Sequence, residues 1–200
     1  MEGLYSPTRD PNVRPEDKGK AFGRWVSGYY THSTAVLAAF PSITLDELRR
    51  GAQQLPDENT SPEHIASVLR MSAEELAEIT DPAVLVSSHT AFGNIDPGVY
   101  KRNLDDALLD ASVWPRIRVS LVWCDMSPAE TLFSTWYLAD RLAHQWPQGA
   151  RKVNLVRFEE ANHFVSCLLF GLPMTNRPES PQQPHWDEPE RTMDLLAGLV

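Results

Sequence analysis

The stretch Asn154-Leu-Val-Arg-Phe-Glu-Glu-Ala-Asn-His163-Phe164 decides the fold of this chain. It begins as a predicted β-strand, because Val153, Leu155, Val156 and Phe158 form a short run of β-branched, aliphatic and aromatic residues. Two glutamates end the run, and the histidine follows a few positions later. We therefore expect the histidine on a loop just beyond the carboxyl end of a strand.

A second apolar run, residues 117–124, precedes the first and reads Ile-Arg-Val-Ser-Leu-Val-Trp-Cys. Residues 127–146 between the two runs predict a helix, which opens with a capping box from Ser127 to Glu130 and stops before Pro147. Its apolar stripe consists of Leu132, Trp136, Ala139, Ala143 and Trp146. Strand, helix and strand in this order predict a βαβ unit with parallel strands.

Two short motifs, Asn-His-Phe at 162–164 and His-Trp-Asp-Glu-Pro-Glu at 185–190, accompany this unit. Together they resemble the C-terminal end of α/β-hydrolases, especially those of fungal type. The resemblance implies the α/β class and a partial α/β-hydrolase fold, with a helical lid followed by the last two parallel strands and their helices. It also implies that His163 is the general base of a nucleophile–His–acid triad.

The acid of that triad has several candidates. The resemblance places it just after the first of the two strands, where Asp125 is the nearest carboxylate. The usual pattern has the acid slightly further on, at the position that Ser127 occupies here. Glu130 is within reach but already has a role in the capping box, and some relatives carry the acid after an earlier strand. The candidates are therefore Asp125, Glu130 or a residue outside this chain.

The sequence contains no Gly-x-Ser-x-Gly elbow and no glycine pair that could donate oxyanion-hole amides. Cys124 stands where an acid loop begins, so a thiol enzyme is a less favoured alternative. Two parallel strands alone cannot bury both faces of a sheet. We expect the chain to be the inactive C-terminal part of a longer ester or related carbonyl hydrolase, with Met1 an internal methionine or a mis-assigned start.

Residues 165–183 separate the two motifs. Deleting them joins Asn-His-Phe directly to Pro-His-Trp-Asp-Glu-Pro-Glu and restores the pattern of the hydrolases. The segment begins with Val165 and ends with Gln183, whose codons can supply the GT and AG of intron boundaries, and its length keeps the reading frame. We expect a retained intron, with a genuine loop insertion as the alternative.

The chain divides into an irregular segment at 1–17, a helical lid-like region at 18–113 and the hydrolase-like portion at 114–200. In the lid-like region, residues 18–40 show apolar side chains at helical spacing. By resemblance to a lid, Trp25, Tyr29 and Tyr30 would line an apolar pocket for a small hydrophobic substrate; core packing is the ordinary explanation for such aromatics. Capping boxes at Thr44–Glu47 and Ser72–Glu75 predict two further helices. Helices are also predicted after Ser61 and Asp96, each of which precedes a proline, and the second of these would turn Val99, Leu104, Ala107 and Leu108 inward. A last helix is expected to begin at Asp187.

The formal charge of −9 and the lack of a basic stripe argue against nucleic acid and against anionic membranes as partners. No window is apolar enough for a spanning helix or a signal peptide. Cys124 and Cys167 give no disulfide framework and no metal spacing, so we expect a cytoplasmic protein without a metal or cofactor. The main rival function is a non-catalytic helical binding protein in which His163 is merely packed.

Overall fold

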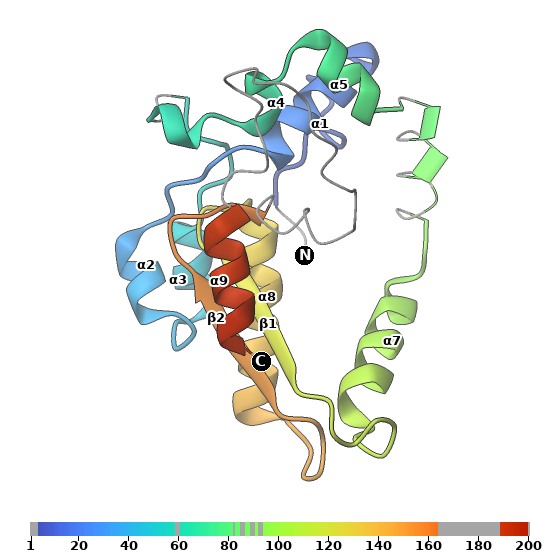
Figure 1. The fold of residues 1–200 in the computed structure, drawn as a ribbon, viewed down its shortest axis with the longest axis vertical. Coiled ribbons are helices and arrows are strands. Elements are labelled where there is room, and N and C mark those ends of the chain that lie inside the picture. Colours follow the sequence, from blue (N-terminus) through green and yellow to red (C-terminus); the bar gives the residue numbers. More distant parts are fainter. Residues whose placement is uncertain are drawn as a thin grey trace.

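The computed structural model describes residues 4–58, 61–81, 83–84, 87–88, 91, 94–163 and 189–199 (Figure 1). The suspected insert at 165–183 lies outside the described residues, and so does Asp187, which we expected to begin the last helix. None of the helices in the described ranges is long and apolar enough to cross a bilayer.

The two predicted strands form a parallel sheet. β1 (Val119–Cys124) pairs with β2 (Val153–Phe158) in a register that aligns the first and the last residues of both strands. Helix α8 (Ala129–His144) connects them, which confirms the βαβ unit. β1 begins two residues later than expected, because the amide of Ile117 donates to the carbonyl of Trp114 in a turn, at 3.1 Å.

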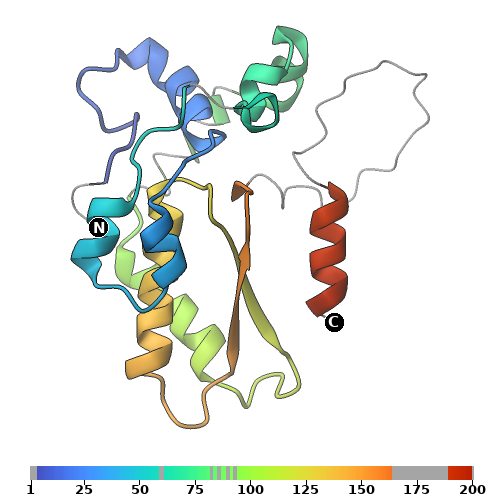
Figure 2. The same cartoon turned by 90° about the vertical axis from the view of Figure 1, so that its left-hand side faces the viewer.

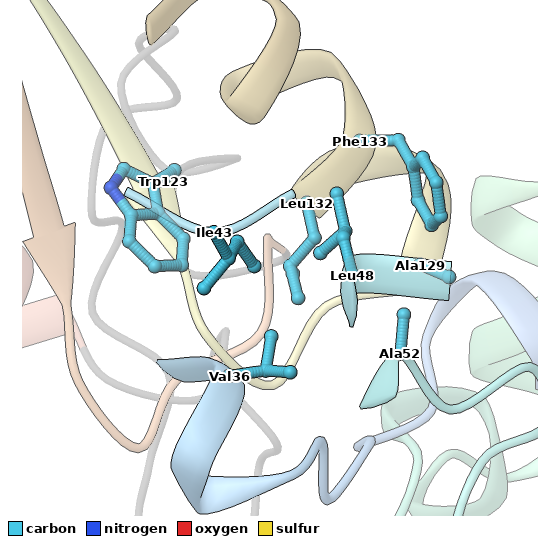
Figure 3. Close-up of a cluster of buried hydrophobic side chains, with 8 residues drawn as sticks. All are labelled: Val36, Ile43, Leu48, Ala52, Trp123, Ala129, Leu132 and Phe133. Atoms are coloured by element: carbon cyan, nitrogen blue, oxygen red, sulfur yellow. The ribbon is translucent and has the colours of Figure 1, made fainter. Parts of the chain in front are cut away.

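The sheet lies between helices on both faces. Figure 2 shows α8, α2 (Thr34–Ala39) and α3 (Leu45–Gly51) on one side, and α9 (Pro189–Leu199) on the other. The main core fills the space between α2, α3, α8 and the sheet (Figure 3). Its members are Val36, Ile43, Leu48, Ala52, Trp123, Ala129, Leu132 and Phe133. Part of the lid-like region therefore shares one core with the sheet.

The remaining N-terminal elements lie beyond the carboxyl ends of the strands (Figures 1 and 2). They are η1 (Pro15–Asp17), α1 (Lys18–Val26), η2 (Pro62–His64), α4 (Ser67–Arg70) and α5 (Ala73–Ile79). The predicted capping boxes at Thr44 and Ser72 are confirmed at the starts of α3 and α5. The segment before η1 is irregular, as expected, yet Pro7 is fully buried and Leu4 packs against the core.

The expected helix at 18–40 is interrupted at 27–33, which was not predicted. Two long-range backbone bonds replace the helical ones: Tyr30 N–H donates to the Met126 carbonyl at 3.1 Å, and Asp57 N–H donates to the Tyr29 carbonyl at 2.9 Å. Gly28 allows the close approach, since a Cβ at this position would lie 2.4 Å from a side-chain carbon of Pro56.

Helix α7 (Pro97–Leu109) begins as predicted, with Asp96 accepting a hydrogen bond from the amide of Gly98 at 2.7 Å. Its inward face is smaller than predicted: Leu108 is buried, but Leu104 and Ala107 are exposed. Polar contacts hold the helix instead. Asp105 accepts from Arg141 of α8 at 2.7 Å, and both side chains are more than four-fifths buried.

The third predicted capping box, at the start of α8, is wrong. Pro128 occupies the N-cap position, and no side chain caps the helix. The Ser127 hydroxyl is fully buried and has no hydrogen-bond partner among the described residues. Glu130 instead pairs with Arg9 at 3.2 Å in a largely exposed ion pair. The local spacing therefore did not determine how this helix begins.

Candidate functional site

The carboxyl ends of β1 and β2 bring the two predicted catalytic residues to the same edge of the sheet. Asp125 directly follows β1, and His163 lies five residues after the end of β2. Hydrogen bonds join the two loops: Asp125 N–H donates to the Phe158 carbonyl at 3.2 Å, and Met126 N–H donates to the Ala161 carbonyl at 2.9 Å. The loop of the candidate acid and the loop of the candidate base thus support each other.

Asp125 as a whole residue is only 4% exposed, and its carboxylate is held by Arg157 of β2. Its Oδ2 atom accepts from Nε of Arg157 at 2.9 Å and from Nη2 at 2.7 Å. The same guanidinium donates to the Leu37 carbonyl at 3.2 Å and lies over the Trp123 ring. The other oxygen, Oδ1, is buried and accepts no hydrogen bond from the described residues. One carboxylate oxygen of Asp125 is therefore held by Arg157, and the other, although buried, can still accept a hydrogen bond.

His163 is largely buried, and burial lowers the pKa of its imidazole to about 4. Burial disfavours the charged form of the ring, because a protonated imidazole loses its hydration in the interior. The Asp125 carboxylate is paired with Arg157. With this pKa the imidazole is neutral at pH 7, which is the form that a general base requires.

A third segment, residues 27–33, completes the site and was not expected there. The Asn162 side chain, which is fully buried, donates from Nδ2 to the Ser27 carbonyl at 3.1 Å. The His32 ring, 2% exposed, accepts at Nδ1 from the Gln53 amide at 2.9 Å, so its Nε2–H donates to the Ser127 carbonyl at 2.8 Å. Burial lowers the pKa of His32, and the hydrogen bond to Ser127 partly offsets this effect.

Sequence reasoning missed both of these polar side chains. Asn162 could have been noticed, because it stands next to His163 in the quoted motif. His32 gives no such signal, since its partners Gln53 and Ser127 are 21 and 95 residues away along the chain.

The aromatic residues predicted to line a substrate pocket are all buried. Trp25, Tyr29 and Tyr30 are 7%, 1% and 0% exposed. The Tyr30 hydroxyl donates to the Trp25 carbonyl at 2.6 Å, and burial raises its pKa. The Tyr29 ring stacks on His64 with 4.6 Å between centroids. In this structure the three side chains pack in the interior, and two of them, Tyr29 and Tyr30, belong to the 27–33 segment.

Among the described residues, those that line a cavity of about 530 Å³ are 114–117, ahead of the amino end of β1. These four residues lie at the opposite end of the strand from Asp125. Among the described residues, no group of three His, Cys, Asp or Glu side chains could hold a metal ion.

Comparison of this chain with models of known protein families, with characterised proteins and with solved structures gives no match.

Proposed function

We propose that this chain supplies the general base of an ester hydrolase of the α/β-hydrolase type, with His163 as the base and Asp125 as the residue that orients it. The observation that carries the proposal is the open Oδ1 of a buried carboxylate on the loop bonded to the loop of His163. Reactive groups of parallel α/β sheets gather outside the carboxyl ends of the strands, where both residues lie.

In this proposal the neutral His163 takes the proton of an attacking hydroxyl and later gives it to the leaving alcohol. Asp125 accepts the other imidazole N–H at Oδ1 and stabilises the imidazolium that forms. Arg157 holds the carboxylate by its other oxygen, so the open oxygen has a fixed direction. The proposal requires the His163 ring to turn toward Oδ1 in the assembled enzyme. The reaction needs no metal and no organic cofactor.

The hydroxyl nucleophile must come from polypeptide outside this sequence, and the sheet offers a place for it. Within the described residues β1 pairs only with β2, so its other edge is open. The strands also keep some apolar side chains only partly buried, namely Leu121, Val122, Leu155 and Val156. Parallel sheets are normally buried on both faces. We propose that further parallel strands, one carrying the nucleophile, add to the outer edge of β1 and form a site for small hydrophobic esters.

Full-length sequencing of the transcript is the first test. The proposal expects a message that extends upstream into a Gly-x-Ser-x-Gly elbow and drops codons 165–183. A fluorophosphonate probe should label the serine of that longer product and leave the 200-residue chain unlabelled. His163→Ala should lower both the labelling rate and kcat/KM for p-nitrophenyl butyrate by about 10³-fold or more. The exposed His144→Ala serves as the matched control. A message that begins at Met1 and keeps the 165–183 codons would contradict the proposal.

A second candidate is a non-catalytic interaction protein, favoured by exposed apolar side chains. Leu69 and Ile79, on α4 and α5, are 52% and 60% exposed, and Trp114 is 72% exposed. Large apolar side chains in solvent often mark binding surfaces. This candidate expects the 200-residue chain alone to unfold cooperatively in urea as a monomer or homodimer. The hydrolase proposal expects the missing strands, supplied as a separate polypeptide, to bind this chain and to raise its free energy of unfolding.

A further inference from the structure

We infer that residues 27–33 act as a clamp between the two catalytic loops, and that Asn162 and His32 are positioning residues that fix His163 and Asp125 relative to each other. The inference rests on the proposed function of these two residues. It assigns a task to the break between α1 and α2, which the helical spacing of the sequence does not predict.

The first arm of the clamp reaches the loop of the base. Asn162 precedes His163 directly, and its side-chain amide donates to the Ser27 carbonyl at 3.1 Å with both residues fully buried. Ser27 is itself fixed to α1, because its amide and its hydroxyl both donate to the Gly23 carbonyl, at 3.1 and 2.8 Å. The position of the base is therefore tied to the end of α1.

The second arm reaches the loop of the acid. His32 donates to the carbonyl of Ser127, which lies two residues after Asp125. The other ring nitrogen accepts from the Gln53 amide, so backbone groups fix the neutral ring on both sides. A side chain with both polar atoms satisfied in the interior holds one geometry, since any other arrangement leaves buried groups without partners.

A central backbone bond closes the arrangement. Tyr30 N–H donates to the Met126 carbonyl at 3.1 Å, and Met126 N–H donates to the Ala161 carbonyl at 2.9 Å. Each of the three segments is thus bonded to the other two. Catalytic side chains need a shell that holds them within fractions of an ångström, and loops alone seldom provide one. Here the segment that leaves α1 provides it, so displacement of α1 should also displace the base.

The test uses a readout that does not depend on turnover. In the 200-residue chain, long-range ¹H–¹⁵N spectra follow the titration of the His163 ring, and mass spectrometry follows its modification by diethyl pyrocarbonate. Asn162→Ala should release the loop, so the His163 pKa should rise from about 4 toward the ordinary 6.5. Modification at pH 6.5 should become roughly 10-fold faster, because the ring becomes accessible. Asn103→Ala, on the exposed face of α7, is the matched control and should change neither value.

Two variants of His32 test the second arm and cover the case in which Asn162→Ala fails to fold. His32→Leu removes both ring hydrogen bonds and should shift the His163 titration in the same direction. His32→Gln keeps a donor for the Ser127 carbonyl and should restore most of the original titration. An unchanged titration and modification rate of His163 in whichever of Asn162→Ala and His32→Leu folds would overturn the inference. If the longer product did not hydrolyse esters, these ring titrations would be unaffected. Failure of the proposed function and failure of this inference are therefore distinguishable.

Discussion

Arg157 and Asp125 form a buried ion pair that joins the ends of the two strands. The side chain of Asp125 is 5% exposed and that of Arg157 is 30% exposed, with Nη2 and Oδ2 2.7 Å apart. Two donors of one guanidinium reach a single oxygen, and the third contact of the arginine goes to the carbonyl of Leu37 in α2. The pair thus links β1, β2 and the helix layer, and it leaves the other carboxylate oxygen, Oδ1, without a hydrogen bond from the described residues.

Arg157→Met should lower the free energy of unfolding by about 2–4 kcal/mol, because it leaves a buried carboxylate without its partner. Asp125→Asn should cost less, since a neutral amide can still accept from the guanidinium. Urea unfolding followed by circular dichroism measures both. Arg14→Met is the matched control, because Arg14 pairs with Asp17 at the surface, where their side chains are 71% and 47% exposed. Loss of this exposed pair should lower the free energy of unfolding by less than about 1 kcal/mol. Equal losses at Arg157 and Arg14 would contradict the role of the buried pair.

Acid should destabilise the fold through its buried histidines. Burial lowers the pKa of His32, and it lowers that of His163 to about 4. Between pH 6.5 and about 4 the unfolded chain binds protons that the folded chain does not, so stability falls as the pH falls through this window. Above pH 6.5 the full contribution is present. Unfolding free energies at pH 7.5 and 5.0 should differ by roughly 1–3 kcal/mol.

The double variant His32→Gln/His163→Gln should flatten this dependence above pH 5. Carboxylates contribute in a different window. Hydrogen bonds lower the pKa values of Glu47, Asp105 and Asp110, so their stabilisation is lost only as the pH falls through values below their ordinary range near 4. A slope between pH 7.5 and 5.0 that persists unchanged in the double variant would contradict the assignment to histidines.

The parts of the fold that depend on neighbours in sequence were predictable. The βαβ unit follows from apolar periodicity, and the boxes at Thr44 and Ser72 from residues three positions apart. The prediction of a capping box at Ser127 was wrong, because the backbone there is held by His32, which lies 95 residues away in the sequence. The prediction of one helix over residues 18–40 was wrong for the same reason, because residues 27–33 bond to the distant Met126 and Asp57. Local spacing carries no information about such partners.

The candidate site shows the same division. The motif around His163 and the position of Asp125 after a strand were visible in the sequence, and the structure places both at one edge of the sheet. The pairing of Asp125 with Arg157 was not visible, because it depends on the register of β1 against β2. Parallel strands separated by a helix fix that register only in three dimensions.

Arg151 should stabilise the turn between α7 and β1. Arg151 is only 7% exposed. Its guanidinium donates to four carbonyls of α7 and of the turn that follows it, those of Ala107, Asp110, Val113 and Trp114. Arg151→Met removes all four of these hydrogen bonds and should cost about 2–4 kcal/mol. Arg151→Lys should recover only part, because a compact ammonium cannot reproduce the planar fork. Limited proteolysis should also cut residues 110–116 faster, whereas the exposed neighbour Lys152→Met should leave both measurements unchanged.

Three serine and threonine positions with the same sequence spacing should respond differently to alanine. Thr44 and Ser72 cap their helices, each accepting from the amide of the glutamate three residues later, so Thr44→Ala and Ser72→Ala should each cost about 1 kcal/mol. The Ser127 hydroxyl caps nothing and is buried without a partner among the described residues. Burying an unbonded hydroxyl is unfavourable, so Ser127→Ala should be neutral or stabilise by up to about 1 kcal/mol. Urea midpoints of the three variants give the comparison. A loss at Ser127→Ala equal to that at Thr44→Ala would show that the hydroxyl does cap α8, as the local sequence predicts.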